Sequence, residues 1–335
     1  MTGPSGAANQ MERALQAYEK RILPPMMILD VTNLCNLKCV HCPQPALAAS
    51  PGYRPAFMRM DHFEKIMENI ERTGEPILVR LVGDGEPLLH PDITAMIRRA
   101  AAIPCAVVNL TTNGLAMRPK MADQILDAGV RLVDFSIDAL TKPVYQKVRL
   151  GGSYEKLMRN IFYFLEKNGK GAGRAKTMVS FITQDENAEE SGKFREFWSP
   201  LVDYVMVRSL HSAAGRVKTA ESAGRNQAAL LDRYPCPHLW KRLTVDFEGN
   251  IKFCAHDWGR DTVLGHMDST DPVTVWAGGN LGKIRAQHLA NRFDAHHLCA
   301  GCSDWASTRW DYGYEKLVDK LVFGAPTLYP FDPAG

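Results

Sequence analysis

Short apolar runs alternate with amphipathic stretches over the first two thirds of the chain, and this alternation limits the possible folds more than any other feature. Each run has the length expected of a buried strand. The runs are Met26–Val31, Ile77–Val82, Ala106–Thr111, Arg131–Ile137, Met178–Thr183 and Tyr204–Arg208. Strand and helix patterns in alternation indicate right-handed βαβ units and a parallel sheet. The sequence therefore predicts an α/β fold, a partial (β/α)6 barrel with its functional residues at the carboxyl ends of the strands.

Two of the intervening stretches carry start and stop signals for helices. Asp61 followed by Glu64 is typical of a capping box, and Gly74 comes after the apolar face that follows it. Ser153 precedes a second apolar face, which ends at Gly169. We therefore expect both segments to be helices packed against the sheet.

The pattern changes after about residue 210. Residues 211–233 are polar with Gly and Ala, which predicts a linker, and residues 244–253 predict a β-hairpin that turns at Gly249. Helical patterns follow near residues 281–292 and 314–322. The expected organisation is an N-terminal extension (1–25), a barrel (26–210), and a linker with a small C-terminal module (211–335).

The charge balance is nearly neutral, with 40 Lys and Arg against 37 Asp and Glu and a formal net charge of +3. This balance gives no electrostatic reason to expect a nucleic acid or an anionic membrane as a partner. The longest apolar stretches are too short to span a bilayer, and the N-terminus lacks the pattern of a secretory signal. We therefore expect a cytoplasmic protein, whose eight cysteines are more typical of metal ligands or catalytic thiols than of disulfides.

Three cysteines follow the first expected strand directly. Cys35, Cys39 and Cys42 have the spacing C-x3-C-x2-C, and a compact loop of this kind can turn three thiolates toward one centre. Three ligands complete only three corners of a cubane iron–sulfur cluster and leave one iron open to another ligand. The alternative is a zinc knuckle in which His41 is the fourth ligand.

This loop resembles that of radical SAM enzymes. The resemblance covers roughly residues 26–210 and implies a [4Fe-4S] cluster whose open iron binds S-adenosylmethionine (SAM). In this family, electron transfer to SAM yields methionine and a 5′-deoxyadenosyl radical, which abstracts hydrogen from the substrate. The electron comes from a reducing partner such as flavodoxin or ferredoxin.

A second matching element is Gly83-Asp84-Gly85-Glu86-Pro87, which follows the second expected strand. It resembles the motif with which the family binds the ammonium group of SAM, so Gly85 and Glu86 are expected at the cofactor. Glycine permits close backbone approach, and a carboxylate accepts hydrogen bonds from a cationic amine. Asp84 stands where the family has a smaller residue. Without this context, the segment is a plausible turn.

Five further residues match the family's contacts to SAM less specifically. The resemblance implies that Asn113 lies near the cofactor, that Ser136 and Asp138 bind the ribose hydroxyls, and that Arg149 pairs with the methionine carboxylate. It also implies that the ring of His41 stacks on the adenine. The alternatives are ordinary loop capping, an Asx turn or a solvent-facing side chain.

A second group of cysteines comprises Cys236, Cys254, Cys299 and Cys302. It resembles the SPASM/twitch modules of many radical SAM enzymes in the short form, which implies one fully ligated auxiliary [4Fe-4S] cluster. The alternative is a four-cysteine zinc ribbon. Cys105 is left over in an apolar run and is expected in the core.

A fully ligated auxiliary cluster favours electron transfer, and the expected reaction is therefore a net two-electron oxidation. The auxiliary-cysteine spacing resembles that of 2-deoxy-scyllo-inosamine dehydrogenases, which implies a small polar substrate and oxidation of a sugar or aminocyclitol hydroxyl in natural-product biosynthesis. Epimerisation and peptide maturation, with thioether or crosslink formation, remain alternatives within the family. An alternative of a different class is a non-catalytic, zinc-stabilised binding module.

Overall fold

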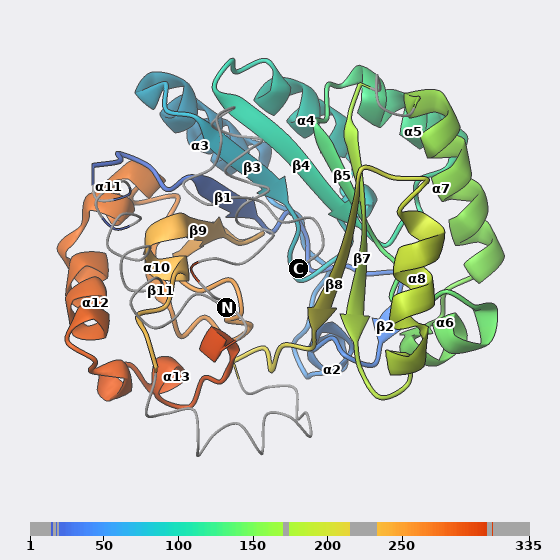
Figure 1. Cartoon of the computed structure of the whole chain (residues 1–335). Coiled ribbons are helices and arrows are strands. Elements are labelled where there is room, and N and C mark those ends of the chain that lie inside the picture. Colours follow the sequence, from blue (N-terminus) through green and yellow to red (C-terminus); the bar gives the residue numbers. More distant parts are fainter. Residues whose placement is uncertain are drawn as a thin grey trace.

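The computed structural model describes residues 20–169, 174–214 and 233–306, together with Leu15, Tyr18 and Trp310. Its centre is a curved sheet with helices along the outer side (Figure 1). Six parallel neighbouring strands make up most of this sheet, in the order β1-β3-β4-β5-β7-β8. Their bounds are β1 Met26–Leu29, β3 Ile77–Leu81, β4 Ala106–Thr112, β5 Leu132–Ser136, β7 Lys176–Thr183 and β8 Tyr204–Ser209. These strands lie within one or two residues of the six apolar runs, which confirms the predicted α/β partial barrel.

Helices connect these strands and cover the outer face of the sheet. They are α3 Met60–Thr73, α4 Ile93–Ala101, α5 Pro119–Asp127, α6 Lys142–Val148, α7 Tyr154–Asn168 and α8 Ser191–Trp198. Ser153 caps α7, since its Oγ accepts a hydrogen bond from the backbone N of Lys156, and Gly169 follows the helix, as predicted. Gly74 ends α3 in the left-handed region, also as predicted.

The predicted capping box at the start of α3 is wrong. The residue preceding the helix is Arg59, and Asp61 lies inside the first turn. The Asp61 carboxylate accepts hydrogen bonds from the Arg59 guanidinium and from the backbone N of His62. Because it is bound to these neighbours, Asp61 does not cap the helix, which begins at Met60, two residues earlier than a cap at Asp61 would place it.

The strands of the C-terminal segment continue the barrel sheet. β9 (Arg242–Val245) pairs in parallel with β1, and β10 (Asn250–Lys252) turns back on β9 as the predicted hairpin. β11 (Val263–His266) pairs antiparallel with β10 and completes the described edge. The sequence predicted a small separate module, but its hairpin shares hydrogen bonds with the barrel. The division at residue 210 stays a prediction.

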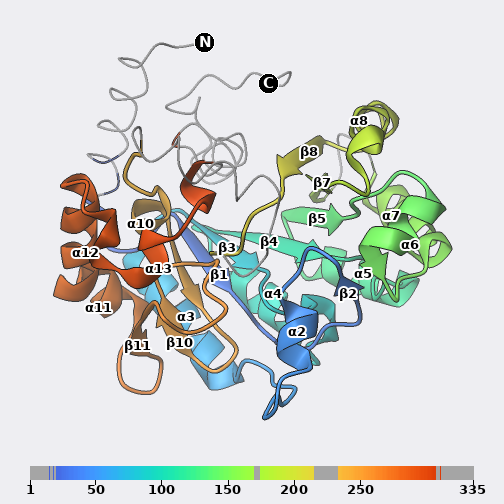
Figure 2. The same ribbon diagram turned by 90° about the horizontal axis from the view of Figure 1, so that it is seen from below.

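Short helices complete the C-terminal segment beside α3 (Figure 2). They are α10 His238–Lys241, α11 Pro272–Ala277, α12 Gly279–Leu289 and α13 His297–Ala300. The helix α12 matches the pattern near residues 281–292, whereas most of the predicted linker and the pattern at 314–322 lie outside the described residues. No helix in the described part of the chain is long and apolar enough to cross a membrane.

Two apolar clusters hold the sheet from its two sides. The larger lies between the sheet and the helices and includes Phe63, Phe135 and Phe164, all fully buried. Cys105, expected in the core, is half-buried and packs against the margin of this cluster. The smaller cluster contains Met26, Ile28, Leu78, Leu132 and Met178, which alternate along their strands with residues of the larger one. It therefore fills the concave side of the sheet.

Candidate functional site

The first group of cysteines and a row of polar residues lie at the carboxyl ends of the barrel strands. The loop with Cys35, Cys39 and Cys42 follows β1, and the Gly83–Pro87 segment follows β3. Asn113 follows β4, and Ser136 and Asp138 lie at the end of β5. Because these strands are parallel neighbours, the residues predicted for the site share one edge of the sheet.

The three thiols of the first loop lie close together. They are free thiols, and Cys39 is in the short strand β2 (Lys38–Cys39), paired with β6 (Arg149–Leu150). Burial raises the pKa of Cys35 to about 11 and that of Cys42 to about 12, and charge on the neighbouring sulfurs raises both further. A bound cation would reverse this penalty, and three thiolates are a soft donor set that suits an iron–sulfur cluster or zinc. The residues present therefore fit such a group.

The Gly83–Pro87 segment supports the cysteine loop through its backbone. A Cβ atom placed on Gly85 would lie 2.4 Å from the carbonyl oxygens of both Thr32 and Leu34. The backbone N of Glu86 donates to the Leu34 carbonyl at 2.8 Å. The sequence assigned this glycine to the cofactor, whereas in the structure its missing side chain lets two loops touch.

The Glu86 carboxylate is buried and receives three hydrogen bonds from the chain. Its donors are the Thr112 hydroxyl at 2.6 Å, the backbone N of Asn113 at 2.7 Å and the backbone N of Leu88 at 3.1 Å. Burial raises the pKa of Glu86 while these donors oppose the rise. Glu86 thus ties the end of β3 to the end of β4, and its contact with an ammonium group stays a prediction.

Asn113 extends this network to the cysteine loop. Its side-chain Nδ2 donates to Oδ1 of Asn36 at 2.7 Å, and its own Oδ1 accepts from the backbone N of Leu115. Asn36 lies between two of the cysteines, and sequence analysis did not single it out. Ser136 ends β5 and is half-buried, and its contact with the ribose stays a prediction.

Asp138 and Arg149 form a buried ion pair beneath the cysteine loop. Asp138 has a left-handed backbone (φ 60°), and its Oδ1 accepts from the backbone N of Ile182 at 2.7 Å. Arg149 donates to Oδ2 of Asp138 and, through Nη1, to the Cys39 sulfur at 3.6 Å. Burial opposes ionisation of Asp138, yet the charge of Arg149 holds its pKa below the ordinary value.

The sequence assigned these two side chains to different parts of SAM, whereas in the structure they bind each other. Asp138 was predicted at the ribose and Arg149 at the methionine carboxylate, but in the structure each is the other's principal partner. Those contacts stay predictions, while the pairing itself positions Cys39. His41 joins the cluster, with Nε2 3.4 Å from Asp138 Oδ2 and Nδ1 3.2 Å from Gln184 Nε2. Burial lowers the pKa of His41 to about 4, so its ring is neutral at pH 7.

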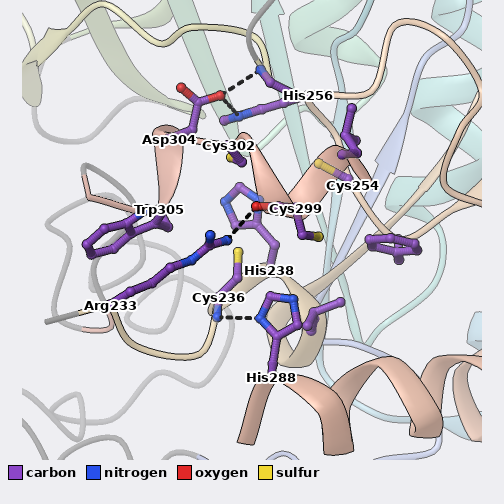
Figure 3. Close-up of a pocket in the computed structure, with 14 residues that line it drawn as sticks. Arg233, Cys236, His238, Cys254, His256, His288, Cys299, Cys302, Asp304 and Trp305 are labelled. Atoms are coloured by element: carbon purple, nitrogen blue, oxygen red, sulfur yellow. Dashed lines mark hydrogen bonds and ion pairs between the residues drawn. The ribbon is translucent and has the colours of Figure 1, made fainter. Parts of the chain in front are cut away.

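The four cysteines of the second group line one cavity (Figure 3). Cys236 precedes α10, Cys254 follows β10, Cys299 is in α13 and Cys302 comes shortly after it. Burial raises the pKa of Cys236 to about 12 and that of Cys299 to about 11, with a further contribution from Cys302 in both cases. As in the first loop, buried thiols that lie close together favour a bound cation. Here four sulfurs line the same cavity.

Arg233 and His288 flank these thiols. The Arg233 guanidinium donates to the Cys299 carbonyl at 2.9 Å and lies 4.4 Å from the ring centre of Phe293. Its charge lowers the pKa of Cys299 and thereby opposes the effect of burial. His288 Nδ1 accepts from the backbone N of Cys236 at 3.3 Å. The Arg233 guanidinium thus partly offsets the negative charge of thiolates in this cavity.

A polar cluster that the sequence did not predict lies beside the second cysteine group. The Asp304 carboxylate accepts from the backbone N atoms of Ser212 and Ala214 and lies 2.9 Å from Nδ1 of His256. These partners hold the pKa of Asp304 well below its usual range, against the effect of burial. His211 lies against the ring of His256, with centroids 5.1 Å apart. No local motif marks this cluster, because its members come from three distant segments.

The two cysteine groups are linked across the concave side of the sheet. The charge of Arg208, near the end of β8, acts on both His41 and His211. Ala255, the neighbour of Cys254, packs against the apolar cluster of Met26 and Ile28. Arg208 is thus close to residues beside both cysteine groups.

Two family models match the chain. Residues 29–196, half of the chain, match the radical SAM superfamily, and residues 236–303 match SPASM, an iron–sulfur cluster-binding domain. The first match contains Cys35, Cys39 and Cys42 and the Gly83–Pro87 segment. The second contains all four cysteines of the cavity. The zinc alternatives that the sequence left open receive no support from either match.

Curated relatives match in part. A GTP 3′,8-cyclase of Lactiplantibacillus plantarum is 32% identical over 153 residues, which are 45% of this chain and 44% of that protein. The mycofactocin maturase MftC of Mycobacterium tuberculosis is 24% identical over 224 residues, 67% of this chain and 52% of that protein. The chain thus spans about half the length of the curated relatives it matches.

Solved structures share the fold at low sequence identity. BtrN in complex with AdoMet and 2-DOIA matches with a TM-score of 0.59 and 15% identity, over 84% of this chain and 93% of that one. Streptococcus suis SuiB bound to its precursor peptide SuiA matches with a TM-score of 0.65 and 15% identity, over 98% of this chain and 79% of that one. These two structures support the fold of the whole described chain.

Proposed function

Because the chain belongs to the radical SAM superfamily and carries a SPASM domain, we propose that it oxidises a hydroxyl-bearing carbon of a small polar substrate. Membership implies SAM and a [4Fe-4S] cluster, and the SPASM domain implies auxiliary iron–sulfur binding. Within the chain, Cys35, Cys39 and Cys42 would hold the SAM-binding cluster. Their three thiols leave one coordination position open.

The observation that carries the proposal is the complete set of four thiols around the second cavity. Four thiolates satisfy a [4Fe-4S] cluster and leave no open iron for a substrate. The group at this position is therefore suited to exchange electrons rather than to bind and polarise a hydroxyl. Ala255, the neighbour of Cys254, packs against the apolar cluster on the concave side of the sheet, which supports an electron acceptor beside the barrel.

When bound, SAM and its cluster would remove one hydrogen atom from the substrate, and the auxiliary cluster would accept one electron. A secondary CH–OH group that also releases a proton then becomes a ketone. The chain's own residues hold this arrangement. Arg149 binds both Asp138 and the Cys39 sulfur, and it thereby holds Cys39 in position. Gly85 and Glu86 contact the backbone of the cysteine loop, where the Glu86 N donates to the Leu34 carbonyl. Asp304 orients the His256 ring, which offers a hydrogen-bonding group for a substrate hydroxyl.

Peptide maturation is the second candidate. The match to MftC, a maturase, extends over two thirds of this chain. The four-thiol cavity is equally compatible with oxidation of a peptide carbon, because the electron acceptor does not depend on the size of the substrate. Identifying the substrate is therefore the decisive step.

The test combines a substrate screen with two cysteine variants. Polyols, aminocyclitols and short peptides deuterated at carbon are incubated anaerobically with SAM and dithionite, and deuterium in 5′-deoxyadenosine is measured. We expect transfer from a deuterated CH–OH carbon and a ketone product. Transfer from peptides alone would replace the first candidate with the second.

The variant Cys299→Ala/Cys302→Ala then tests the electron acceptor. We expect it to keep cleaving SAM and to lose the ketone, with iron falling from on the order of eight per chain to about four. Cys105→Ala is the matched control, because Cys105 is half-buried against the larger apolar cluster and belongs to neither cysteine group; this variant should keep full iron and product. Circular dichroism checks folding, since loss of a metal site can unfold a small domain. A normal ketone yield from the folded double variant would disprove the acceptor role.

A further inference from the structure

Two carboxyl groups meet at the carboxyl ends of two neighbouring strands. Asp30 directly follows β1, and Asp84 lies in the Gly83–Pro87 segment after β3. The backbone N of Asp84 donates to Oδ1 of Asp30 at 2.9 Å. A Cβ atom on Gly83 would lie 2.2 Å from the same Oδ1, so this glycine leaves the space that the Asp30 side chain fills. The two loops therefore hold the two carboxyl groups as a pair.

The two members of this carboxyl pair differ in burial and in charge. Asp30 is 2% exposed, and its Oδ2 has no hydrogen-bond partner among the described residues. Asp84 is half-buried and is the more open of the two. Burial and the charge of Asp84 raise the pKa of Asp30 well above its usual range. Burial raises the pKa of Asp84 to about 6, against the effect of Asp30. At pH 7 Asp30 therefore holds a proton and Asp84 is mostly ionised.

Charged groups of the C-terminal segment surround Asp84. Lys252 lowers the pKa of Asp84, while Asp246 and Asp257 raise it. Both of these aspartates already accept backbone N–H hydrogen bonds within their own loops. Lys252 is buried, and its Nζ donates to the Asp257 carbonyl at 3.1 Å and lies 3.7 Å from Oδ2 of Asp246. Lys252 and Asp30 are thus the groups that stabilise an ionised Asp84.

The carboxyl pair lies between segments that belong to the two cysteine groups. Asp30 opens the loop of the first group, and Lys252 is two residues before Cys254 of the second. One continuous sheet contains both, because β1 pairs with β9 and β9 pairs with β10 (Figure 1). Thr244 is the register partner of both Ile28 and Lys252, so these three side chains share the concave face of the sheet. Asp30 follows Ile28 by two residues and therefore faces the same side.

We propose that Asp84, positioned by Asp30, is the proton acceptor of the proposed oxidation. The proposal rests on the proposed function, in which the substrate C–H bond breaks first and its hydrogen atom goes to the 5′-deoxyadenosyl radical. The substrate O–H bond then breaks, its electron pair stays on the oxygen, and its proton goes to the Asp84 carboxylate. One electron passes from the substrate radical to the auxiliary cluster, and the carbon is left as a ketone. A carboxylate whose pKa lies just below neutral pH is suited to this task.

The proton and the electron are expected to favour each other's transfer. Reduction adds negative charge at the second cysteine group, and nearby negative charge raises the pKa of a carboxyl group. Asp84 should therefore bind a proton more strongly once the auxiliary cluster is reduced. By linkage, reduction of the auxiliary cluster should become more favourable as pH falls. This coupling needs no substrate and can be measured directly.

The test is a potentiometric titration of the auxiliary cluster at several pH values. The reconstituted protein is titrated between pH 6 and 9, and the reduced clusters are followed by electron paramagnetic resonance. Adding SAM changes the signal of the first cluster and thereby identifies it. We expect the equilibrium constant for reduction of the auxiliary cluster to fall about tenfold over this range, which is ~59 mV for one electron. Asp84→Asn should remove most of this pH dependence, and Asp84→Glu, which keeps a carboxylate, should retain it.

Asp246→Asn is the matched control. Asp246 faces the same lysine, so the variant removes one negative charge from the same surroundings. Its Oδ1 accepts the backbone hydrogen bonds of Glu248 and Asn250, and the amide oxygen of an asparagine can accept them as well. This variant should shift the potential at every pH and keep its slope against pH. Circular dichroism checks that each variant is folded.

The outcomes separate this proposal from the proposed function. Equal slopes in folded Asp84→Asn and in the unmodified protein would overturn the proposal. With a substrate found in the screen, Asp84→Asn should still transfer deuterium to 5′-deoxyadenosine and lose at least tenfold in ketone formation, and a normal ketone yield would also overturn it. Absence of deuterium transfer from every hydroxyl compound would instead count against the proposed function. The slopes would then still decide whether Asp84 takes up a proton when the auxiliary cluster is reduced.

Discussion

Substituting Gly85 by alanine is the sharpest test of how the first cysteine loop is held. A Cβ atom at this position would lie 2.4 Å from two backbone carbonyl oxygens, those of Thr32 and Leu34, and 2.9 Å from the carbonyl carbon of Asn33. These atoms belong to backbone, so no side-chain rotation can relieve the contact. Restoring an ordinary van der Waals distance requires the loop to move by about 1 Å.

The expected cost follows from this overlap. Overpacking of a well-packed site costs about 1–3 kcal/mol. Because every 1.4 kcal/mol is tenfold, the population of the native loop should fall by roughly 5- to 150-fold relative to displaced arrangements. Cys35 follows Leu34 directly, so the displacement falls on a proposed cluster ligand.

The assay is cluster loading and SAM binding after anaerobic reconstitution. Gly85→Ala should lose iron toward about four per chain, and the remaining cluster should show no spectral response to SAM. Gly282→Ala is the control, because a Cβ at Gly282 in α12 meets no atom within 4 Å. Alanine there should load fully and stabilise the helix by about 0.5–1 kcal/mol. Full iron and an unchanged SAM dissociation constant in Gly85→Ala would refute this account of the loop.

Three further predictions follow from the same contacts. Glu86→Gln should weaken SAM binding by about 1.5–3 kcal/mol, since a carbonyl–amide replaces a charged acceptor, and calorimetry should show it; an unchanged affinity would remove Glu86 from the SAM site. Arg149→Met should lower the free energy of unfolding, measured by urea titration, by about 3–5 kcal/mol, because it leaves the Asp138 carboxylate buried and unpaired. Adding Asp138→Asn should recover part of this loss. No recovery would contradict the ion pair. Burial raises the pKa of Asp84 to about 6 from 3.8, so its ionisation opposes folding. The free energy of unfolding should therefore rise as pH falls from 7 to 5. An Asp84→Asn variant with the same pH slope would contradict this assignment.

Local pattern predicted the elements of the fold because the barrel strands other than β8 are largely buried on both faces. Their continuous apolar runs need no partner to be recognised, and helices such as α7 carry their own signals in Ser153 and Gly169. The capping box failed because Asp61 has an arginine two residues before it as a better partner. Which strands pair is a different matter. The union of β9 with β1 joins segments more than 200 residues apart, and nothing in either sequence records it.

The candidate site divides in the same way. Cys35, Cys39 and Cys42 could be predicted because one short loop holds all three, and the spacing restricts their geometry. Asp138 and Arg149 were each singled out for the cofactor, yet the structure joins them to each other. A motif assigns each residue a role separately and does not reveal that two opposite charges, both buried, will neutralise one another first. The cluster around Asp304 was missed altogether, since its partners come from segments about 50 and 90 residues away.

Asp84 shows how a departure from a family pattern acquires a reason only in three dimensions. A carboxylate there would be costly alone, because burial raises the pKa of Asp84 and the charge of Asp246 raises it further. Lys252 provides the compensating charge, which lowers the pKa of Asp84 against the effect of burial. Lys252 lies in β10, two residues before Cys254, and its Nζ donates to the Asp257 carbonyl at 3.1 Å. The charge that makes Asp84 tolerable beside the first loop therefore belongs to the strand that delivers a ligand to the second cysteine group, which couples the two halves of the site through one lysine.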